Sequence, residues 1–176
     1  MKFDNYLVRQ VTMDDAAAYF KLISNNRKRL ERFFAGTVAI TQTFDATIDH
    51  LADVISKAGR DKYFPFVVVD TNTNELVGSI QVKSVDWSIP KAEIGYYVDA
   101  AYEGKGIISK AVGMIVDFAF KEKNFRKLYI RTHESNTGSI KIAEKNGFKL
   151  EGVITCDYKT TDGEVIDTMY FGRINP

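Results

Sequence analysis

Residues 93–109 read EIGYYVDAAYEGKGIIS, and this stretch decides the fold. The residues at 92–98 are rich in apolar and aromatic side chains and predict a strand. Two glycines follow at 104 and 106, and a long amphipathic helix begins at Ile107 and runs to about Asn124. When a strand leads into a glycine loop and then into a helix, the backbone N–H groups of the loop point outward at the positive end of the helix dipole. This arrangement suits a phosphate or diphosphate group.

Two well-known phosphate-binding motifs do not match this loop. A Walker loop needs a lysine directly after its second glycine, whereas Lys105 precedes Gly106. A dinucleotide fingerprint needs a third glycine, and Ser109 stands at that position. The glycines taken alone also fit an ordinary tight turn. Lys105 and Lys110 add positive charge nearby, so the interpretation is a loop for some other phosphate-bearing ligand.

The apolar periodicity of the remaining chain predicts a mixture of strands and helices. The expected strands are 6–11, 64–70, 76–85, 92–98, 128–132, 148–158 and 165–172. The expected helices are 16–22, 45–59, 107–124 and 139–145. Thr12 and Asp15 form a capping pair before the first of these helices, Asp45 is the expected cap of the second, and Gly59 ends it. This order is not the regular βαβ alternation of a doubly wound fold. It predicts an α+β (mixed α/β) fold in a single domain, 1–176, with a central mixed, mostly antiparallel sheet flanked by helices on both faces.

The composition is that of a globular protein, with 45% hydrophobic and 27% charged residues. Because 24 basic residues face 23 acidic ones, the net charge is +1, and neither nucleic acid nor a membrane is an expected partner. No apolar run approaches the ~20 residues that cross a bilayer, and residues 1–5 do not resemble a signal peptide, so a cytoplasmic location is expected. The histidines, His50 and His133, and the one cysteine, Cys156, do not predict a metal site. Cys156 is expected to be a small core residue.

Four segments, spread over nearly the whole chain, resemble the GNAT acetyltransferases and among them the RimJ/RimL-type N-acetyltransferases. They are EIGYYV at 93–98, EGKGII at 103–108, NTGS at 136–139 and EKNGFKLEG at 144–152. The resemblance implies a GNAT fold, with acetyl-CoA as cosubstrate. It also implies that the sheet splays apart between strands 92–98 and 128–132, and that the cofactor lies in this cleft.

The resemblance also implies which residues hold the cofactor. Backbone groups of Tyr97 and Val98 would pair with the pantetheine arm, and a backbone donor near Val98 would polarise the thioester carbonyl. Glu103 stands where the family has Gln or Arg, and we expect its carboxylate to face solvent. The N–H groups of the loop would cradle the diphosphate; the residues are Gly104, Lys105, Gly106, Ile107, Ile108 and Ser109.

Asn136 and Ser139 are typical helix-starting residues, which is a sufficient structural reason for their presence. The resemblance implies more: Asn136 contacts the cofactor and Ser139 protonates the departing thiolate. The base that accepts the amine proton is left open between Glu93, Asp157 and ordered water, and both carboxylates also have structural interpretations. His133 is expected to be a surface or hydrogen-bonded residue and not a base.

The function expected from these features is direct transfer of acetyl from acetyl-CoA to a primary amine in a ternary complex. The preferred acceptor is a protein N-terminal α-amine of the ribosomal-protein type. A small amine, such as a polyamine or an aminoglycoside, and a CoA-binding module without turnover are the alternatives. The basic run at 27–32 is expected to be a solvated helix face. The sequence leaves a homodimer open.

Overall fold

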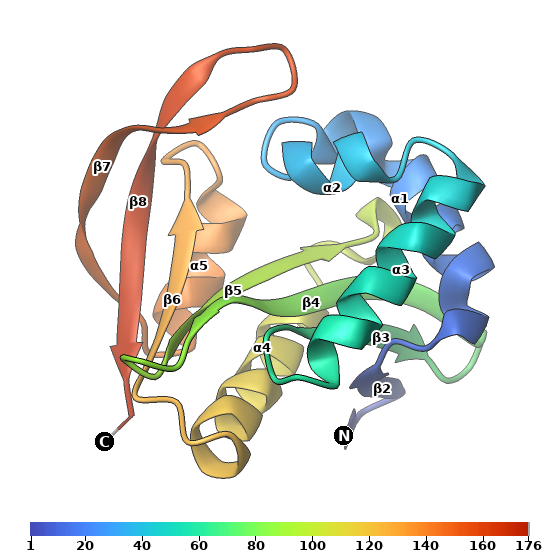
Figure 1. The fold of residues 1–176 in the computed structure, drawn as a ribbon, viewed down its shortest axis with the longest axis horizontal. Coiled ribbons are helices and arrows are strands. Elements are labelled where there is room, and N and C mark those ends of the chain that lie inside the picture. The colour runs from blue at the N-terminus through green and yellow to red at the C-terminus, as the bar shows by residue number, and fades with distance from the viewer. Residues whose placement is uncertain (176) are drawn as a thin grey trace.

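The computed structural model describes residues 1–175, and within this range eight strands form one sheet in the order β1-β2-β3-β4-β5-β6-β8-β7 (Figure 1). The expected α+β fold, with its mixed and mostly antiparallel sheet, is confirmed. The strands are β1 Lys2–Phe3, β2 Tyr6–Gln10, β3 Phe64–Asp70, β4 Glu75–Asp86, β5 Lys91–Val98, β6 Lys127–Thr132, β7 Lys149–Lys159 and β8 Val165–Ile174. The helices are α1 Ala16–Leu30, α2 Ala35–Ile40, α3 Phe44–Ala58, α4 Ile107–Asp117 and α5 Thr137–Lys145.

Helices cover both faces of the sheet, because alternate residues of its strands are apolar on each side. One apolar core joins α1 and α3 to Val67 and Val69 of β3. A second core joins α4 to the opposite face, through Phe66 and Val68 of the same strand. The alternation along β3 therefore fixes two layers of helices, which hold the sheet between them (Figure 1).

The sheet opens between β5 and β6, which are parallel neighbours. Their pairing covers Lys91–Glu93 and Lys127–Tyr129. Beyond this point β5 stays paired with β4, whereas β6 stays paired with β8. Figure 1 shows β4 and β5 running away from β6 and β8. The expected splaying is confirmed, and it places the carboxyl ends of β5 and β6 on the two sides of a cleft.

The boundaries of the N-terminal helices differ from those that the sequence predicts. The first helix continues past residue 22 to Leu30, because Ile23 and Leu30 extend its buried stripe. The expected cap at Asp45 is wrong. Thr43 caps α3 through its hydroxyl oxygen, which accepts the Ala46 N–H at 3.2 Å, and Asp45 lies in the first turn. Both residue types are good caps, so sequence preference did not distinguish them.

The later segments show two further differences. The helix expected at 107–124 ends as α4 at Asp117 and passes into a π-helical turn, Phe118–Glu122. Cys156 is exposed and not a core residue, because β7 is the edge strand and has an irregular register between Ile154 and Tyr158. Among residues 1–175, no helix is long and apolar enough to span a membrane, and no group of three or more His, Cys, Asp and Glu side chains is placed to hold a metal ion.

Candidate active site

The glycine loop leads directly into α4 and leaves space above its backbone. Gly104 and Gly106 have φ values of 72° and 75°, in the left-handed region that favours glycine. A Cβ at either position would meet no atom within 4 Å, so the loop backbone is open to a ligand. Gly106 is the residue before the first turn of α4, whose N–H groups point out of the helix. The loop therefore has the form of an anion-binding site.

A cleft of about 710 Å³ lies beside the loop, between the end of β5 and α5. Its volume is that of a site for an extended small molecule. The residues predicted for the cofactor that line it are Tyr97, Val98, Gly104, Gly106, Ile107, Ile108, Ser109, Asn136 and Ser139. Lys105 is not among the lining residues, because its ammonium lies over the Tyr102 ring, 4.7 Å from the centroid. Lys110 pairs with Asp4 at 2.6 Å.

Arg29 of α1 reaches into this cleft, although its sequence context suggested only a solvated helix face. Its guanidinium donates to the Val98 carbonyl and forms an ion pair with Glu103. Asn26 accepts a further hydrogen bond from Arg29 at 3.0 Å. Glu103 is exposed, as expected, but its charge is compensated by an arginine from a distant part of the chain. The expectation for the basic run is wrong at this position.

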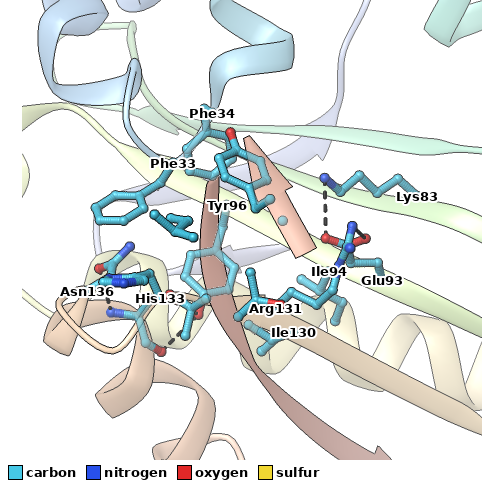
Figure 2. Close-up of a pocket in the computed structure, with 16 residues that line it drawn as sticks. Phe33, Phe34, Lys83, Glu93, Ile94, Tyr96, Ile130, Arg131, His133 and Asn136 are labelled. Carbon is cyan, nitrogen blue, oxygen red and sulfur yellow. Dashed lines mark hydrogen bonds and ion pairs between the residues drawn. The ribbon is translucent and has the colours of Figure 1, made fainter. Parts of the chain in front are cut away.

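A smaller cavity of about 90 Å³ adjoins the cleft, on the α1 side of the opened sheet. Figure 2 shows Phe33, His133 and Asn136 at one end of it and Lys83 with Glu93 at the other. The residues that line both the cleft and this cavity are Phe33, Phe34, Tyr96, Asn136 and Ser139. A ligand in the cleft and a second ligand in the cavity would therefore meet at these five side chains.

Ser139 lies in the first turn of α5, and its neighbours fix its position. Asn136 caps the helix, because its side-chain oxygen accepts the Ser139 N–H at 3.2 Å. The Ser139 hydroxyl oxygen lies 3.0 Å from the Tyr96 hydroxyl oxygen. Asn136 thus supplies the cap, and the hydroxyl of Ser139 remains available at the junction of the two spaces.

The two predicted carboxylates belong to one charge network. Glu93 is only 5% exposed, and its two oxygens pair with Lys83 at 3.4 Å and Arg131 at 3.0 Å. Asp157 pairs with Arg131 at 3.1 Å and accepts the Thr168 hydroxyl at 2.6 Å. Burial lowers the pKa of the Arg131 guanidinium, but Glu93 and Asp157 outweigh this effect, and the pKa is raised. Arg131 is therefore a permanent cation between two carboxylates.

His133 lies at the mouth of the small cavity and is hydrogen-bonded, as expected. The Ser135 N–H donates to His133 Nδ1 at 3.2 Å, and the Ser135 hydroxyl lies 2.8 Å from the same nitrogen. A neutral imidazole has one acceptor nitrogen, and here Nδ1 fills that role. The proton of the neutral ring therefore lies on Nε2, which makes that nitrogen a donor.

Comparison with known proteins identifies the family of this chain. The model of the acetyltransferase (GNAT) domain matches residues 5–149. The chain belongs to the GNAT family. It is an N-acetyltransferase.

Relatives of the GNAT protein cover most of its length at low identity. The probable N-acetyltransferase YjcK of Bacillus subtilis (strain 168) is 27% identical over 177 residues, which is 100% of this chain and 97% of YjcK. The spermidine N(1)-acetyltransferase of Escherichia coli (strain K12) is 24% identical, over 80% of this chain and 71% of its own.

Two solved structures share the fold closely. The ribosomal-protein-S5-alanine acetyltransferase of Vibrio fischeri superposes with a TM-score of 0.90 at 25% identity, covering 99% of this chain and 96% of its own. RimL, a ribosomal L7/L12 alpha-N-protein acetyltransferase solved in complex with coenzyme A, also gives 0.90, at 20% identity, covering 98% of this chain and 95% of its own.

Several residues of the GNAT site were not foreseen from the sequence. Lys83 and Arg131 appear in strands as ordinary charged residues, and only strand pairing brings them to Glu93. Phe33 and Phe34 follow α1, and no local pattern points to their place at the junction. Tyr158 lines the small cavity, whereas its neighbour Asp157 is not among the lining residues. Both residues lie where the register of β7 is irregular, so simple alternation along the strand does not tell which of the two side chains faces the cavity.

The charge network gives a prediction for stability. Arg131→Met should lower the free energy of unfolding by about 2 kcal/mol, because two carboxylates would lose their shared cation. The Arg131 side chain is 33% exposed, so solvent screening makes this loss of stability smaller than that expected for a fully buried ion pair. Urea denaturation measures the change. The double variant with Glu93→Gln should recover part of the loss. An unchanged midpoint in Arg131→Met would show that the network does not stabilise the fold.

Proposed function

We propose that this acetyltransferase transfers acetyl from acetyl-CoA to a protein or peptide N-terminal α-amine, while both substrates are bound. The supporting observation is that the groups eligible to act as a base are already engaged. Glu93 is shared by two cations, Asp157 is held by Arg131 and Thr168, and Nδ1 of His133 accepts the Ser135 N–H. Such a site favours an amine that releases its proton easily. The expected cytoplasmic location is part of the proposal.

Proton energetics distinguish the two kinds of amine in proteins. An α-amine has a pKa near ~8 and a lysine side chain near ~10.4, so neutralising them at pH 7 costs about 1.4 and about 4.6 kcal/mol. A site without a free base supplies little of this energy. The α-amine is therefore the acceptor that the site can use with water as the proton carrier.

The charges around the small cavity argue against a polycation. Lys83 and Arg131 balance Glu93 and Asp157, so this network has no surplus negative charge for a polyamine or an aminoglycoside. The spermidine acetyltransferase among the relatives keeps a polyamine as the second candidate. The ribosomal-protein acetyltransferases that share the fold support the first.

In this proposal, each part of the site has one task. The N–H groups from Gly104 to Ser109 bind the diphosphate, and the backbone of Tyr97 and Val98 binds the pantetheine arm once Arg29 leaves the Val98 carbonyl. Acetyl-CoA supplies the activated acetyl thioester. Asn136 fixes the first turn of α5 beside the cofactor, and Ser139 donates its hydroxyl proton to the leaving thiolate.

The acceptor preference is tested with acetyl-CoA and a panel of peptides, polyamines and aminoglycosides. Two versions of one peptide are compared, one with a free α-amine and one with a blocked N-terminus and a free lysine. The kcat/KM of the first should be at least tenfold higher, because its amine costs less free energy to neutralise. The rate with the α-amine should rise with pH and level off near ~8, the pKa of the amine itself. Release of free thiol measures each rate.

The other outcomes identify the alternatives. A plateau well below the pKa of the amine would indicate an enzymic base, and Glu93→Gln and Asp157→Asn would then show which carboxylate it is. A higher kcat/KM for spermidine or an aminoglycoside than for every peptide would contradict the acceptor assignment and leave the acetyl-CoA chemistry intact. Binding of acetyl-CoA without thiol release from any acceptor would favour the non-catalytic module.

A further inference from the structure

Tyr96 has a hydrogen bond at the centre of the site that the roles above do not use. The residue lies on β5 at the junction of the cleft and the small cavity, and it is 8% exposed (Figure 2). Its hydroxyl oxygen lies 3.0 Å from Ser139 Oγ and 3.1 Å from the Ser139 carbonyl oxygen. Burial raises the pKa of Tyr96 to about 12, so the hydroxyl keeps its proton near neutral pH. Tyr96 therefore has one proton to donate and two acceptors on one residue.

The choice between these acceptors decides where the Ser139 proton points. If Tyr96 donates to the carbonyl, the oxygen of its hydroxyl is free to accept the Ser139 O–H, and that proton points away from the cleft. If Tyr96 donates to Ser139 Oγ, the Ser139 proton is free to point into the cleft, which Ser139 also lines. The carbonyl lies within α5, where the N–H four residues later is its natural partner. This carbonyl therefore already has a donor, whereas Tyr96 is the one hydrogen-bond partner of Ser139 Oγ among residues 1–175, so donation to Oγ satisfies an oxygen that otherwise has no donor.

We propose that Tyr96 is a positioning residue, whose hydroxyl donates to Ser139 Oγ and turns the Ser139 proton toward the sulfur of the cofactor. As the bond from the amine nitrogen to the acetyl carbon forms and the carbon–sulfur bond breaks, the sulfur takes the Ser139 proton. Solvent accepts the proton that the amine loses and returns one to Ser139, while Tyr96 keeps its own. The inference rests on the proposed acid role of Ser139 and not on the identity of the acceptor.

The direct test is Tyr96→Phe, which removes one oxygen atom and keeps the ring in the core. We expect kcat to fall about tenfold, because misplacing the Ser139 proton would remove a part of the rate enhancement that a general acid usually supplies. The Kd for acetyl-CoA should change less than about twofold. In a Ser139→Ala background, the same change should lower kcat less than about twofold further, because the two residues act as a unit. Tyr6→Phe is the matched control, since Tyr6 packs against the same core and lines neither space.

A second measurement does not depend on turnover. The pKa of an unperturbed thiol is near ~8.5, and a hydrogen bond to the thiolate lowers it. In a pH titration of the CoA complex, followed by the ultraviolet absorbance of the thiolate, the pKa of the bound thiol should be higher in Tyr96→Phe than in the unaltered protein by about one. A merely structural role for the hydroxyl would leave this pKa unchanged.

The outcomes separate this inference from the proposal that it rests on. A normal kcat in Tyr96→Phe together with a slow Ser139→Ala variant overturns the inference alone. A normal kcat in both variants overturns the acid role of Ser139 and the inference with it. The inference about Tyr96 is also overturned if the losses of kcat are additive in the double variant, or if the pKa of the bound thiol is unchanged in Tyr96→Phe.

Discussion

Ser139→Ala should lower kcat about 100-fold and leave the Kd for acetyl-CoA nearly unchanged. The physical reason is that a general acid acts on charge that develops in the transition state, so its loss slows the reaction without weakening the bound ground state. The hydroxyl lies at the junction of the cleft and the small cavity, where the thioester and the amine would meet. Steady-state kinetics give kcat, and calorimetry gives the Kd.

The design of this test depends on the cap of α5. Asn136 supplies the capping oxygen, so Ser139→Ala should not change the melting temperature appreciably. Asn136→Ala removes the cap itself, and its melting temperature shows how much stability the cap of α5 contributes. If Ser139→Ala melts earlier but turns over normally, the residue is part of the helix start and has no chemical role.

Gly106→Asp should weaken acetyl-CoA binding at least tenfold, and about 100-fold if the carboxylate remains ionised beside the diphosphate. At a φ of 75° any side chain costs some backbone strain, but aspartate and asparagine tolerate this region better than other residues do. The space above Gly106 is open, so the new side chain would stand in the ligand's position. Isothermal calorimetry with acetyl-CoA measures the change.

Gly106→Asn is the matched control for this charge. It has nearly the same size and the same backbone strain but no charge, so the difference between the two variants isolates electrostatic repulsion. That difference should shrink as salt is added, because the loop is exposed to solvent. Equal affinities in Gly106→Asp and in the unaltered protein, with both folded, would remove the loop from the cofactor site.

The sequence by itself determined the features that depend on short segments. The glycine loop before Ile107 predicted an anion site, because only glycine adopts the left-handed conformation freely beside a helix start. The apolar runs at 64–70 and 76–85 predicted two neighbouring strands, and these pair as β3 and β4. The order of strands and helices predicted a mixed sheet, and the four GNAT segments predicted where it opens. Each of these signals is read from the residues of short segments or from the order of those segments along the chain.

Tertiary structure alone decided which side chains meet. Arg29 and Glu103 are 74 residues apart, and they meet because α1 packs across the end of β5. Arg131 comes to Glu93 through the parallel pairing of β5 and β6, and to Asp157 through the pairing of β6 with β8 and of β8 with β7. Tyr96 reads as a packing residue until the first turn of α5 places Ser139 within 3.0 Å of its hydroxyl. A hydrogen bond or ion pair depends on distances of a few ångströms, and distances between remote segments are set by packing and register, not by local residue preference.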